Sequence, residues 1–343
     1  MAETWLVTGG AGFIGSNFVD IALAESWCDR LVVLDALTYA GSIENLRPLI
    51  DDDPRLVFVL GDVADPVAAG ETIKDYRPAM VFHFAAESHV DRSILDPAPF
   101  IRTNVLGTQV MLDAARREGV RRFVHVSTDE VFGALPINTT DRFSEATPYA
   151  PNSPYAASKA GSDLLVRAAF HTHGQNVVIT NCSNNYGPFQ YPEKLIPLMI
   201  SNALAGKPLP VYGDGLYVRD WIHVEDHCRA VISAALKGRA GETYCIGGDN
   251  EQPNIAVVRD ILALTGRDDS LIEYVRDRPG HDRRYAIDST KARTELDWAP
   301  RIAWKDGLAS TVEWYRDRAE WIDRIRTGGN YEAYYAKQYG AKG

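Results

Sequence analysis

The sequence predicts an α/β protein with a doubly wound, parallel sheet and a smaller, mixed α/β domain that binds a substrate. Over the first half of the chain, short apolar runs typical of buried strands alternate with segments of helical apolar periodicity. A glycine-rich turn follows the first of these runs. Beyond about residue 183 the alternation gives way to short strands, prolines and turn-rich segments, which favours a second domain there.

The composition is typical of a globular protein with a large core, since 45% of the 343 residues are hydrophobic and 24% are charged. The net charge of −10 argues against a nucleic-acid partner. We expect no membrane association, because no run approaches the roughly 20 apolar residues of a membrane span and the first strand begins without a signal core. The four cysteines are scattered with no CxxC motif, which favours reduced thiols and a cytoplasmic protein.

The first strand is expected at residues 5–8, and it runs into the glycine turn GGAGFIG. Backbone N–H groups in such a turn, together with the N-terminus of the next helix, can bind a diphosphate. The spacing is GxxGxxG rather than the more common GxGxxG, and such a turn can also simply close a corner between strand and helix. The residues expected at a cofactor here are Gly9, Gly12, Phe13, Ile14 and Gly15.

The second strand strengthens this prediction because it ends in an acid. Residues 31–35 end in Asp35, about 20 residues beyond Gly15. A carboxylate there can accept hydrogen bonds from both hydroxyl groups of an adenosine ribose, and it repels a 2′-phosphate. The sequence therefore predicts a Rossmann-type domain that binds NAD in preference to NADP.

The later elements complete this domain. Strands are expected at residues 56–60, 80–84 and 176–181, and helices at 42–50, 67–75 and 97–118. Asp62 follows the third strand and could contact the adenine amino group or serve as a turn residue. Ala85 and Ala86 follow the fourth, where small side chains let the cofactor pass or simply pack closely. We expect the NAD-binding domain over 1–183, with about 214–250 returning to it, and the substrate domain in most of 184–343.

Three polar residues follow the strand expected at residues 123–127. Thr128, Asp129 and Glu130 come directly after it, at the edge of the sheet where ligands bind in such folds. The alternative for the two acids is a pair of solvated loop residues.

A helix expected from residue 154 to about 172 carries a second polar pair. Ser153 is a good N-cap and Pro154 a good first residue, so Tyr155 and Lys159 lie one turn apart on one face. The Lys159 ammonium is expected to favour the phenolate and lower the pKa of Tyr155, so that the tyrosine exchanges a proton with a substrate hydroxyl. The alternative is a surface helix pair.

Together these motifs resemble the extended short-chain dehydrogenase/reductase family. The similar segments are TGGAGFIGS, Asp35, the pair Asp62 and Val63, FHFAAESHVDRS, and the YxxxK spacing of Tyr155 and Lys159. Within that family, four more segments resemble the dTDP-glucose 4,6-dehydratases: STDEVFG at 127–133, NNYGP at 184–188, PEKLIP at 192–197 and RPGHDRRYAID at 278–288.

The resemblance implies dehydration of dTDP-glucose to dTDP-4-keto-6-deoxyglucose. Tyr155, beside Thr128 and Lys159, would accept the 4-hydroxyl proton while C4 passes a hydride to NAD⁺. The 4-ketone acidifies the C5 hydrogen, which Glu130 would remove while Asp129 protonates the departing 6-hydroxyl. NADH would return its hydride to C6, and Glu130 would reprotonate C5. Neighbouring carboxyls in a partly desolvated cleft favour keeping one of them protonated.

The resemblance also implies contacts to the nucleotide sugar. Arg219 and Arg278 would bind the diphosphate through their forked donors, with support from Asn254. The full expected set is Ser88, Asn184, Glu193, Lys194, Pro210, Tyr212, Arg219, Asn254, Arg278 and His281. The alternatives are surface salt bridges for the arginines, a solvated helix position for Lys194 and a structural role for His281.

Other functions stay open. A nucleotide-sugar 4-epimerase or decarboxylase would keep the glycine turn, Tyr155 and Lys159 but would have no use for the acid pair. A UDP-glucose 4,6-dehydratase and a non-catalytic NAD-binding regulatory protein are further alternatives. Tight NAD binding without turnover of any nucleotide sugar would favour the last.

The resemblance implies a homodimer, because family members usually pair through two helices each. Residues 108, 111, 112 and 115 could belong to the core or to that dimer face. His223 and His227 have a metal-like spacing but no third ligand, so we expect no metal and place residues 221–230 at the start of a helix that runs to residue 237.

Overall fold

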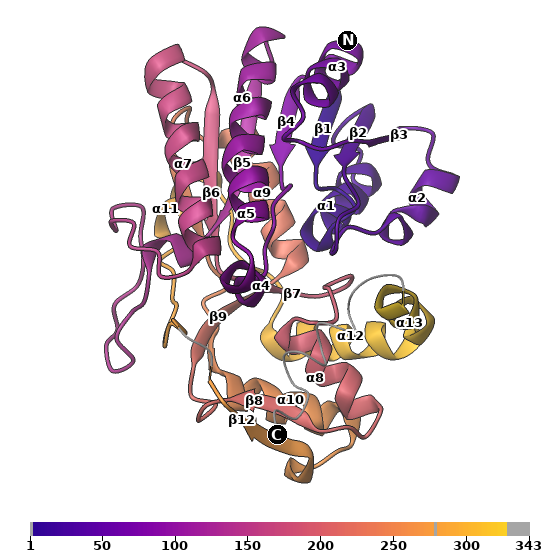
Figure 1. The fold of residues 1–343 in the computed structure, drawn as a ribbon, viewed down its shortest axis with the longest axis vertical. Coiled ribbons are helices and arrows are strands. Elements are labelled where there is room, and N and C mark those ends of the chain that lie inside the picture. The colour runs from indigo at the N-terminus through magenta and orange to yellow at the C-terminus, as the bar shows by residue number, and fades with distance from the viewer. Residues whose placement is uncertain (1–2, 278–279, 328–343) are drawn as a thin grey trace.

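The computed structural model describes residues 3–277 and 280–327, and its centre is a seven-stranded sheet in the order β10-β6-β5-β4-β1-β2-β3 (Figure 1). Every neighbouring pair in this sheet is parallel. Its strands are β1 (Thr4–Thr8), β2 (Arg30–Asp35), β3 (Leu56–Leu60), β4 (Met80–His83), β5 (Arg122–Thr128), β6 (Val177–Cys182) and β10 (Thr243–Ile246). The predicted doubly wound, parallel Rossmann-type sheet is confirmed.

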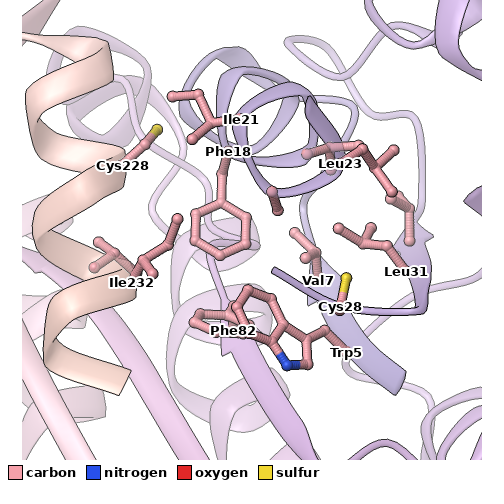
Figure 2. Packing of buried hydrophobic residues seen from close by; sticks show 14 of the residues in the cluster. Trp5, Val7, Phe18, Ile21, Leu23, Cys28, Leu31, Phe82, Cys228 and Ile232 are labelled. Atoms are coloured by element: carbon pink, nitrogen blue, oxygen red, sulfur yellow. The ribbon is translucent and has the colours of Figure 1, made fainter. Parts of the chain in front are cut away.

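Helices cover both faces of the sheet. They are α1 (Phe13–Ala24), α2 (Arg47–Asp52), α3 (Pro66–Tyr76), α4 (Val90–Leu95), α5 (Ala98–Phe100), the π-helical η2 (Ile101–Gly107), α6 (Thr108–Arg117), α7 (Pro154–His173) and α9 (Val224–Lys237). Side chains of α1 and α9 pack on one face and those of α3, α6 and α7 on the other. In Figure 2, Phe18 of α1 and Ile232 of α9 lie near Trp5 and Phe82 of the sheet. The helices therefore bury both faces of the sheet.

A second, smaller assembly lies below the sheet in Figure 1. It contains β7 (Asn184–Tyr186), α8 (Leu195–Leu204), β8 (Leu209–Tyr212), β9 (Val218–His223), β11 (Glu251–Pro253), α10 (Asn254–Thr265), β12 (Ile272–Val275), α12 (Trp304–Asp317) and α13 (Ala319–Thr327). Helix α11 (Thr290–Leu296) packs beside α9 and β10 of the larger part. Strands β11, β9 and β7 form one small sheet, and β12 and β8 form another. Helices α8, α10, α12 and α13 share a hydrophobic core. The domain boundaries stay a prediction.

Three expected helices differ from the structure. The helix at 42–50 is two short ones, η1 (Ile43–Asn45) and α2, because Pro48 near the start of α2 has no N–H to continue an earlier helix. The helix at 97–118 is α5, η2 and α6 in succession, with a π-helical middle. Residues 221–223 end β9 instead of opening a helix, because they pair with β7. Within the described residues, no helix is long and apolar enough to cross a membrane.

Candidate active site

A cavity of about 930 Å³ lies at the carboxyl ends of the central strands, where ligands bind in open α/β sheets. Most of the residues expected at a site line it. They are Gly9, Gly12, Phe13, Ile14, Gly15, Asp35, Asp62, Val63, Ala85, Ala86, Ser88, Thr128, Glu130, Tyr155, Lys159, Asn184, Glu193, Lys194, Pro210, Tyr212, Arg219, Asn254 and His281. Asp129 lies behind the cavity wall, and Arg278 lies outside the described residues.

The glycine turn is packed so tightly that side chains are excluded. Gly9 has a φ of 71°, and a Cβ there would come within 2.6 Å of the Ala85 nitrogen. A Cβ at Gly15 would come within 2.2 Å of the Gly9 carbonyl oxygen. Helix α1 begins after Gly12, no side-chain hydrogen bond caps this N-terminus, and Phe13, Ile14 and Gly15 of its first turn line the cavity. This is the arrangement that suits a diphosphate.

Asp35 is held in place at the end of β2 by the backbone. Its Oδ2 accepts a hydrogen bond from the Ala11 nitrogen at 2.9 Å, and its Oδ1 accepts one from the Leu37 nitrogen at 2.8 Å. Burial raises the pKa of Asp35, and these two N–H groups oppose the rise. The carboxylate is therefore fixed at the cavity wall, as a ribose acceptor must be.

Asp62 serves as a turn residue, which was one of its two expected roles. Its Oδ1 accepts a hydrogen bond from the Ala64 nitrogen at 2.8 Å, and its Oδ2 forms an ion pair with Arg102 of η2. The side chain still lines the cavity. Arg102 was missed from the sequence because it comes from a distant helix.

The acid pair follows β5 in a short 3-10 helix, η3 (Asp129–Phe132). Thr128 Oγ1 accepts a hydrogen bond from the Glu130 nitrogen at 3.3 Å and lies 3.4 Å from Asp129 Oδ1. Asp129 is 1% exposed, so the alternative of two solvated loop acids is wrong for it. Burial raises its pKa well above the ordinary value, and the nearby Glu130 and Asp220 raise it further. These influences favour the protonated form of Asp129, which lies beside the cavity-lining Glu130.

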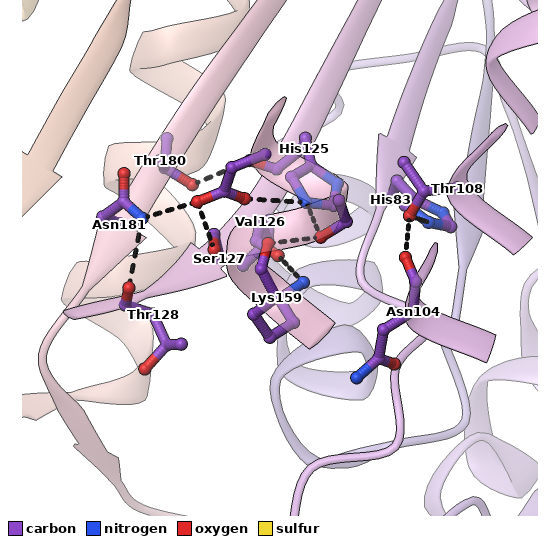
Figure 3. A network of polar contacts seen from close by, with 12 residues as sticks. His83, Asn104, Thr108, His125, Val126, Ser127, Thr128, Lys159, Thr180 and Asn181 are labelled. Atoms are coloured by element: carbon purple, nitrogen blue, oxygen red, sulfur yellow. Dashed lines mark hydrogen bonds and ion pairs between the residues drawn. The ribbon is translucent and has the colours of Figure 1, made fainter. Parts of the chain in front are cut away.

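Tyr155 and Lys159 lie near the start of α7, which begins as expected. Ser153 Oγ accepts a hydrogen bond from the Ala156 nitrogen at 3.1 Å, and Pro154 is the first helical residue. Tyr155 and Lys159 are 8% and 3% exposed, so the alternative of a surface helix pair is wrong. Lys159 Nζ donates to the Val126 carbonyl at 2.8 Å, as Figure 3 shows.

The expected lowering of the Tyr155 pKa by Lys159 is wrong for this structure. Burial raises the pKa of Tyr155 well above its ordinary value, and the negative charge of Glu130 adds to the rise. A hydrogen bond with Thr128 opposes it. Burial also lowers the pKa of Lys159. Desolvation disfavours both charged forms, and the sequence does not reveal it.

Glu193 and Lys194 are anchored within the protein. Glu193 pairs with Arg92 at 3.0 Å and lies 3.5 Å from His89, and burial raises its pKa. Lys194 Nζ donates to the Ser88 carbonyl at 2.8 Å, so it is not a solvated helix residue. Arg92 also stacks over the ring of Tyr39 at 4.4 Å. His89 and Arg92 belong to the FHFAAESHVDRS segment, which was the only sequence signal for them.

Arg219 is buried, so the surface salt bridge expected as its alternative is wrong. Its guanidinium donates to the carbonyls of Val218 and Asp282 at 2.8 and 2.9 Å and lies 4.3 Å from the centre of the Tyr285 ring. Arg283, in contrast, does pair with an exposed acid, Asp214, at 3.0 Å. Arg219 is therefore held rigidly at the cavity.

The turn with Pro210 and Tyr212, which the resemblance implies would contact the base, lies beside His281. Tyr212 OH donates to Asp91 Oδ2 at 3.4 Å. His281 stacks on Tyr217 with ring centres 3.8 Å apart, and its Nδ1 lies 2.8 Å from Asp277 Oδ1. These contacts support the structural role for His281, although its side chain also lines the cavity.

The paired histidines have structural partners. His227 Nδ1 lies 2.9 Å from Asn185 Oδ1, and His223 packs edge-on against Tyr186. Among residues 3–277 and 280–327, no group of three or more His, Cys, Asp or Glu side chains has the arrangement of a metal site.

Comparisons with known proteins agree with this geometry. The family model of GDP-mannose 4,6 dehydratase matches residues 6–311. The dTDP-glucose 4,6-dehydratase of Xanthomonas campestris pv. campestris strain B100 is 53% identical, with 95% of this chain and 96% of that protein covered. The dTDP-glucose 4,6-dehydratase 1 of Escherichia coli K12 is 48% identical, with 97% and 98% covered.

A solved structure is equally similar. The dTDP-glucose 4,6-dehydratase DesIV of Streptomyces venezuelae, crystallised with NAD and dTDP bound, matches with a TM-score of 0.90 and 50% identity. The match covers 94% of this chain and 99% of that one. The chain therefore belongs to the family described by the GDP-mannose 4,6 dehydratase model and, within it, to the dTDP-glucose 4,6-dehydratases.

Proposed function

We propose that this protein removes water from dTDP-glucose to give dTDP-4-keto-6-deoxyglucose, with NAD as its cofactor. The observation that carries the proposal is the acid pair: Glu130 and Tyr155 line one cavity, and Asp129, whose protonated form burial favours, lies directly behind the wall next to Glu130. Relatives about half identical to the chain over nearly its full length are dTDP-glucose 4,6-dehydratases, and one of them binds NAD.

The residues present fit NAD. The N-terminus of α1 offers N–H groups to a diphosphate, and the carboxylate of Asp35 is fixed where a ribose would bind. Ala85 is in close contact with Gly9, which leaves the strand end free of bulky side chains. When bound, NAD would supply a reversible hydride acceptor for the oxidation at C4 and the reduction at C6.

The chain's own groups then move protons. Tyr155, assisted by Thr128 and Lys159, takes the 4-hydroxyl proton as C4 is oxidised to a ketone. The ketone acidifies the C5 hydrogen, and Glu130 removes it. Asp129, whose protonated form burial favours, gives its proton to the leaving 6-hydroxyl, so the C6–O bond breaks and water departs. Glu130 returns its proton to C5 when C6 is reduced. The proton that Tyr155 took from the 4-hydroxyl replaces, by way of solvent, the proton that Asp129 gave, so protons and electrons balance over one turnover.

The substrate-binding roles are part of the same proposal. Arg219 would bind the diphosphate, and Tyr212 and Pro210 would contact the base. Asn184 would contact the sugar diphosphate, and Glu193 and Lys194 would face the sugar and the nucleotide. Their common position on the wall of one cavity supports these roles. We also propose that residues 184–327 mainly form the substrate domain, since α8, α10 and α12 have a core of their own.

Turnover in deuterated water tests the function. With dTDP-glucose, we expect the product to have lost one water and to carry deuterium at C5. Mass spectrometry would measure the first change and NMR the second. A galacto product would instead support a 4-epimerase, and bound NAD without turnover of any nucleotide sugar would support a non-catalytic protein. Comparing dTDP-, UDP-, GDP- and CDP-glucose at equal concentration would test base preference, where we expect dTDP-glucose to react fastest.

We further propose a homodimer formed through η2 and α7, which pack side by side. Ile101, Leu106 and Leu164 on these helices are 52%, 49% and 58% exposed, beside an apolar depression of about 630 Å³. The residues at 108, 111, 112 and 115 are buried in the core of one chain, so they are not the dimer face.

Leu106→Asp should produce a monomer in analytical ultracentrifugation, because it places a charge in that surface. Leu264→Asp, at an apolar position 38% exposed on α10, is the matched control and should stay dimeric. A monomeric unmodified protein would contradict the proposal. All four cysteines are buried and unpaired, which supports the further proposal of a reducing, cytoplasmic location.

A further inference from the structure

Helix α7 carries a second buried charged residue that the reaction above does not use. Asp163 lies one helical turn beyond Lys159, and the two side chains belong to residues that are 1% and 3% exposed. A charged group is expensive to bury unless it is paired or hydrogen-bonded, so a buried aspartate beside a buried lysine calls for an explanation.

Hydrogen bonds from three different parts of the chain converge on the Asp163 carboxylate. Its Oδ2 accepts from Ser127 Oγ of β5 at 2.9 Å, from Tyr149 OH at 2.9 Å and from Asn181 Nδ2 of β6 at 3.1 Å. Three donors from separate segments of the chain therefore meet at one oxygen of this side chain.

The same network reaches the end of β5. Asn181 Nδ2 also donates to the Thr128 carbonyl at 3.1 Å, as Figure 3 shows. Asp129 and Glu130 follow directly in the chain. Asp163 therefore connects the helix that carries Tyr155 to the strand end that carries the acid pair.

The other titratable groups near this carboxylate are neutral. His125 Nε2 of β5 lies 3.2 Å from Asp163 Oδ1, but burial lowers the pKa of His125 to about 4. His83 of β4 stacks on His125 and also has a lowered pKa because it is buried. Burial raises the pKa of Tyr149, so its hydroxyl stays protonated.

Burial also raises the pKa of two thiols on neighbouring strands, Cys182 of β6 and Cys245 of β10. Burial lowers the pKa of Lys159, and Asp163 is the first opposing influence on it. The hydrogen bond from Lys159 Nζ goes to an uncharged group, the Val126 carbonyl. Among the neighbours that raise the pKa of Lys159, Asp163 has the largest influence, and it lies one turn away on the same helix.

We propose that Asp163 is a positioning residue for the dehydration: its carboxylate balances the buried charge of Lys159 and ties the acid-bearing end of β5 to α7. The proposal rests on the proposed function for its kinetic consequence only. Its electrostatic part is a property of the folded protein and can be tested without substrate.

The kinetic test is the pH dependence of kcat/KM for Asp163→Asn. Without the carboxylate the Lys159 ammonium loses its proton more readily, so the alkaline decline in activity should move to lower pH by about one unit or more. Asp163→Glu should restore the wild-type decline. Tyr149→Phe removes a hydrogen bond to Asp163 but no charge, and its alkaline decline should stay in place. A loss of activity in Asp163→Asn with an unmoved decline would overturn the charge-balancing role.

The test without substrate is a double-mutant cycle in thermal unfolding with Asp163→Asn and Lys159→Met. Each single change leaves one buried charge unbalanced, so each should lower the unfolding temperature. The double variant should unfold at a higher temperature than the Asp163→Asn variant. Additive losses, or a double variant that fails to fold where Lys159→Met alone folds, would reject the proposal. The result of this cycle holds even if dTDP-glucose proves not to be the substrate.

Discussion

Asp129 occupies a place where an ionised carboxylate is costly. Its side chain is enclosed, its Oδ2 has no hydrogen-bond partner within the described part of the chain, and two further acids, Glu130 and Asp220, lie nearby. Burial raises the pKa of Asp220 to about 6, so this neighbour is itself charged at neutral pH. The same environment that makes Asp129 a proton donor therefore makes the folded state less stable.

Asp129→Asn should stabilise the protein at neutral pH. The folded state holds the Asp129 proton more tightly than the unfolded chain does, so wild-type stability falls as the pH rises from the ordinary aspartate pKa toward the raised one. The variant removes this loss. Since one unit of pKa shift is worth about 1.4 kcal/mol, we expect a gain on that order at about pH 7.5 that shrinks toward zero near about pH 4. Urea unfolding at both pH values checks it, and an equal effect at both would contradict the explanation.

Replacing Glu130 and replacing Asp129 should impair different steps of the reaction. Glu130→Gln removes the base, so both deuterium incorporation at C5 and loss of water should fall by about 10²–10⁴-fold. Asp129→Asn removes the acid, so loss of water should fall while C5 exchange continues. NMR of dTDP-glucose incubated in deuterated water separates the two. Our assignment would not survive if Asp129→Asn stopped exchange as completely as Glu130→Gln does.

At the scale of elements, α7 determines where the phenol lies. Its first turn is set by Ser153 and Pro154, and Tyr155 follows at once. A cap in this position stabilises the helix and also orients the residue that exchanges a proton with the substrate.

Ser153→Ala should destabilise the protein by about 1 kcal/mol and slow turnover, because the Ala156 N–H loses its acceptor. Ser310→Ala is the matched control, since Ser310 is an exposed serine inside α12 whose hydroxyl bonds only back to the Gly307 carbonyl. The control should be neutral or slightly stabilising. Chemical denaturation and steady-state kinetics of both variants test this, and equal losses would show that the cap has no special role.

The elements themselves could largely be predicted, because their signals are local. Short apolar runs predicted the strands β1 to β6, and Ser153 with Pro154 predicted the start of α7 to the residue. Residues 221–223 were placed in a helix because their partner strand, β7, lies more than 30 residues away in the chain. Long-range pairing outweighs local preference there.

At the scale of the whole molecule, the site is assembled from positions between Gly9 and His281, and this is where the sequence was least informative. Motifs could identify Asp35, Glu130 and Tyr155 as site residues. They could not reveal that Asp129 lies behind the wall or that burial raises the pKa of Tyr155, because both depend on neighbours from distant segments. The roles of these residues in catalysis stay predictions.

Because the cavity lies between the sheet edge and the smaller assembly, NAD and dTDP should each raise the unfolding temperature, and each through its own residues. A ligand at about 100 times its Kd stabilises by about 2.7 kcal/mol. Asp35→Asn should lose most of the shift produced by NAD and keep that produced by dTDP. Arg219→Lys should do the reverse, because it loses the forked donor that suits a diphosphate.

Arg283→Lys makes the same exchange at a half-buried arginine that pairs with Asp214 and does not line the cavity, so it should keep both shifts. Differential scanning fluorimetry with each ligand alone and with both together gives the comparison. If Arg219→Lys and Arg283→Lys lost the dTDP shift equally, the effect would come from overall charge and not from a diphosphate site at Arg219. If Asp35→Asn abolished both shifts, the two ligands would depend on one region of the fold, and the division of the cavity into a cofactor end and a substrate end would be wrong.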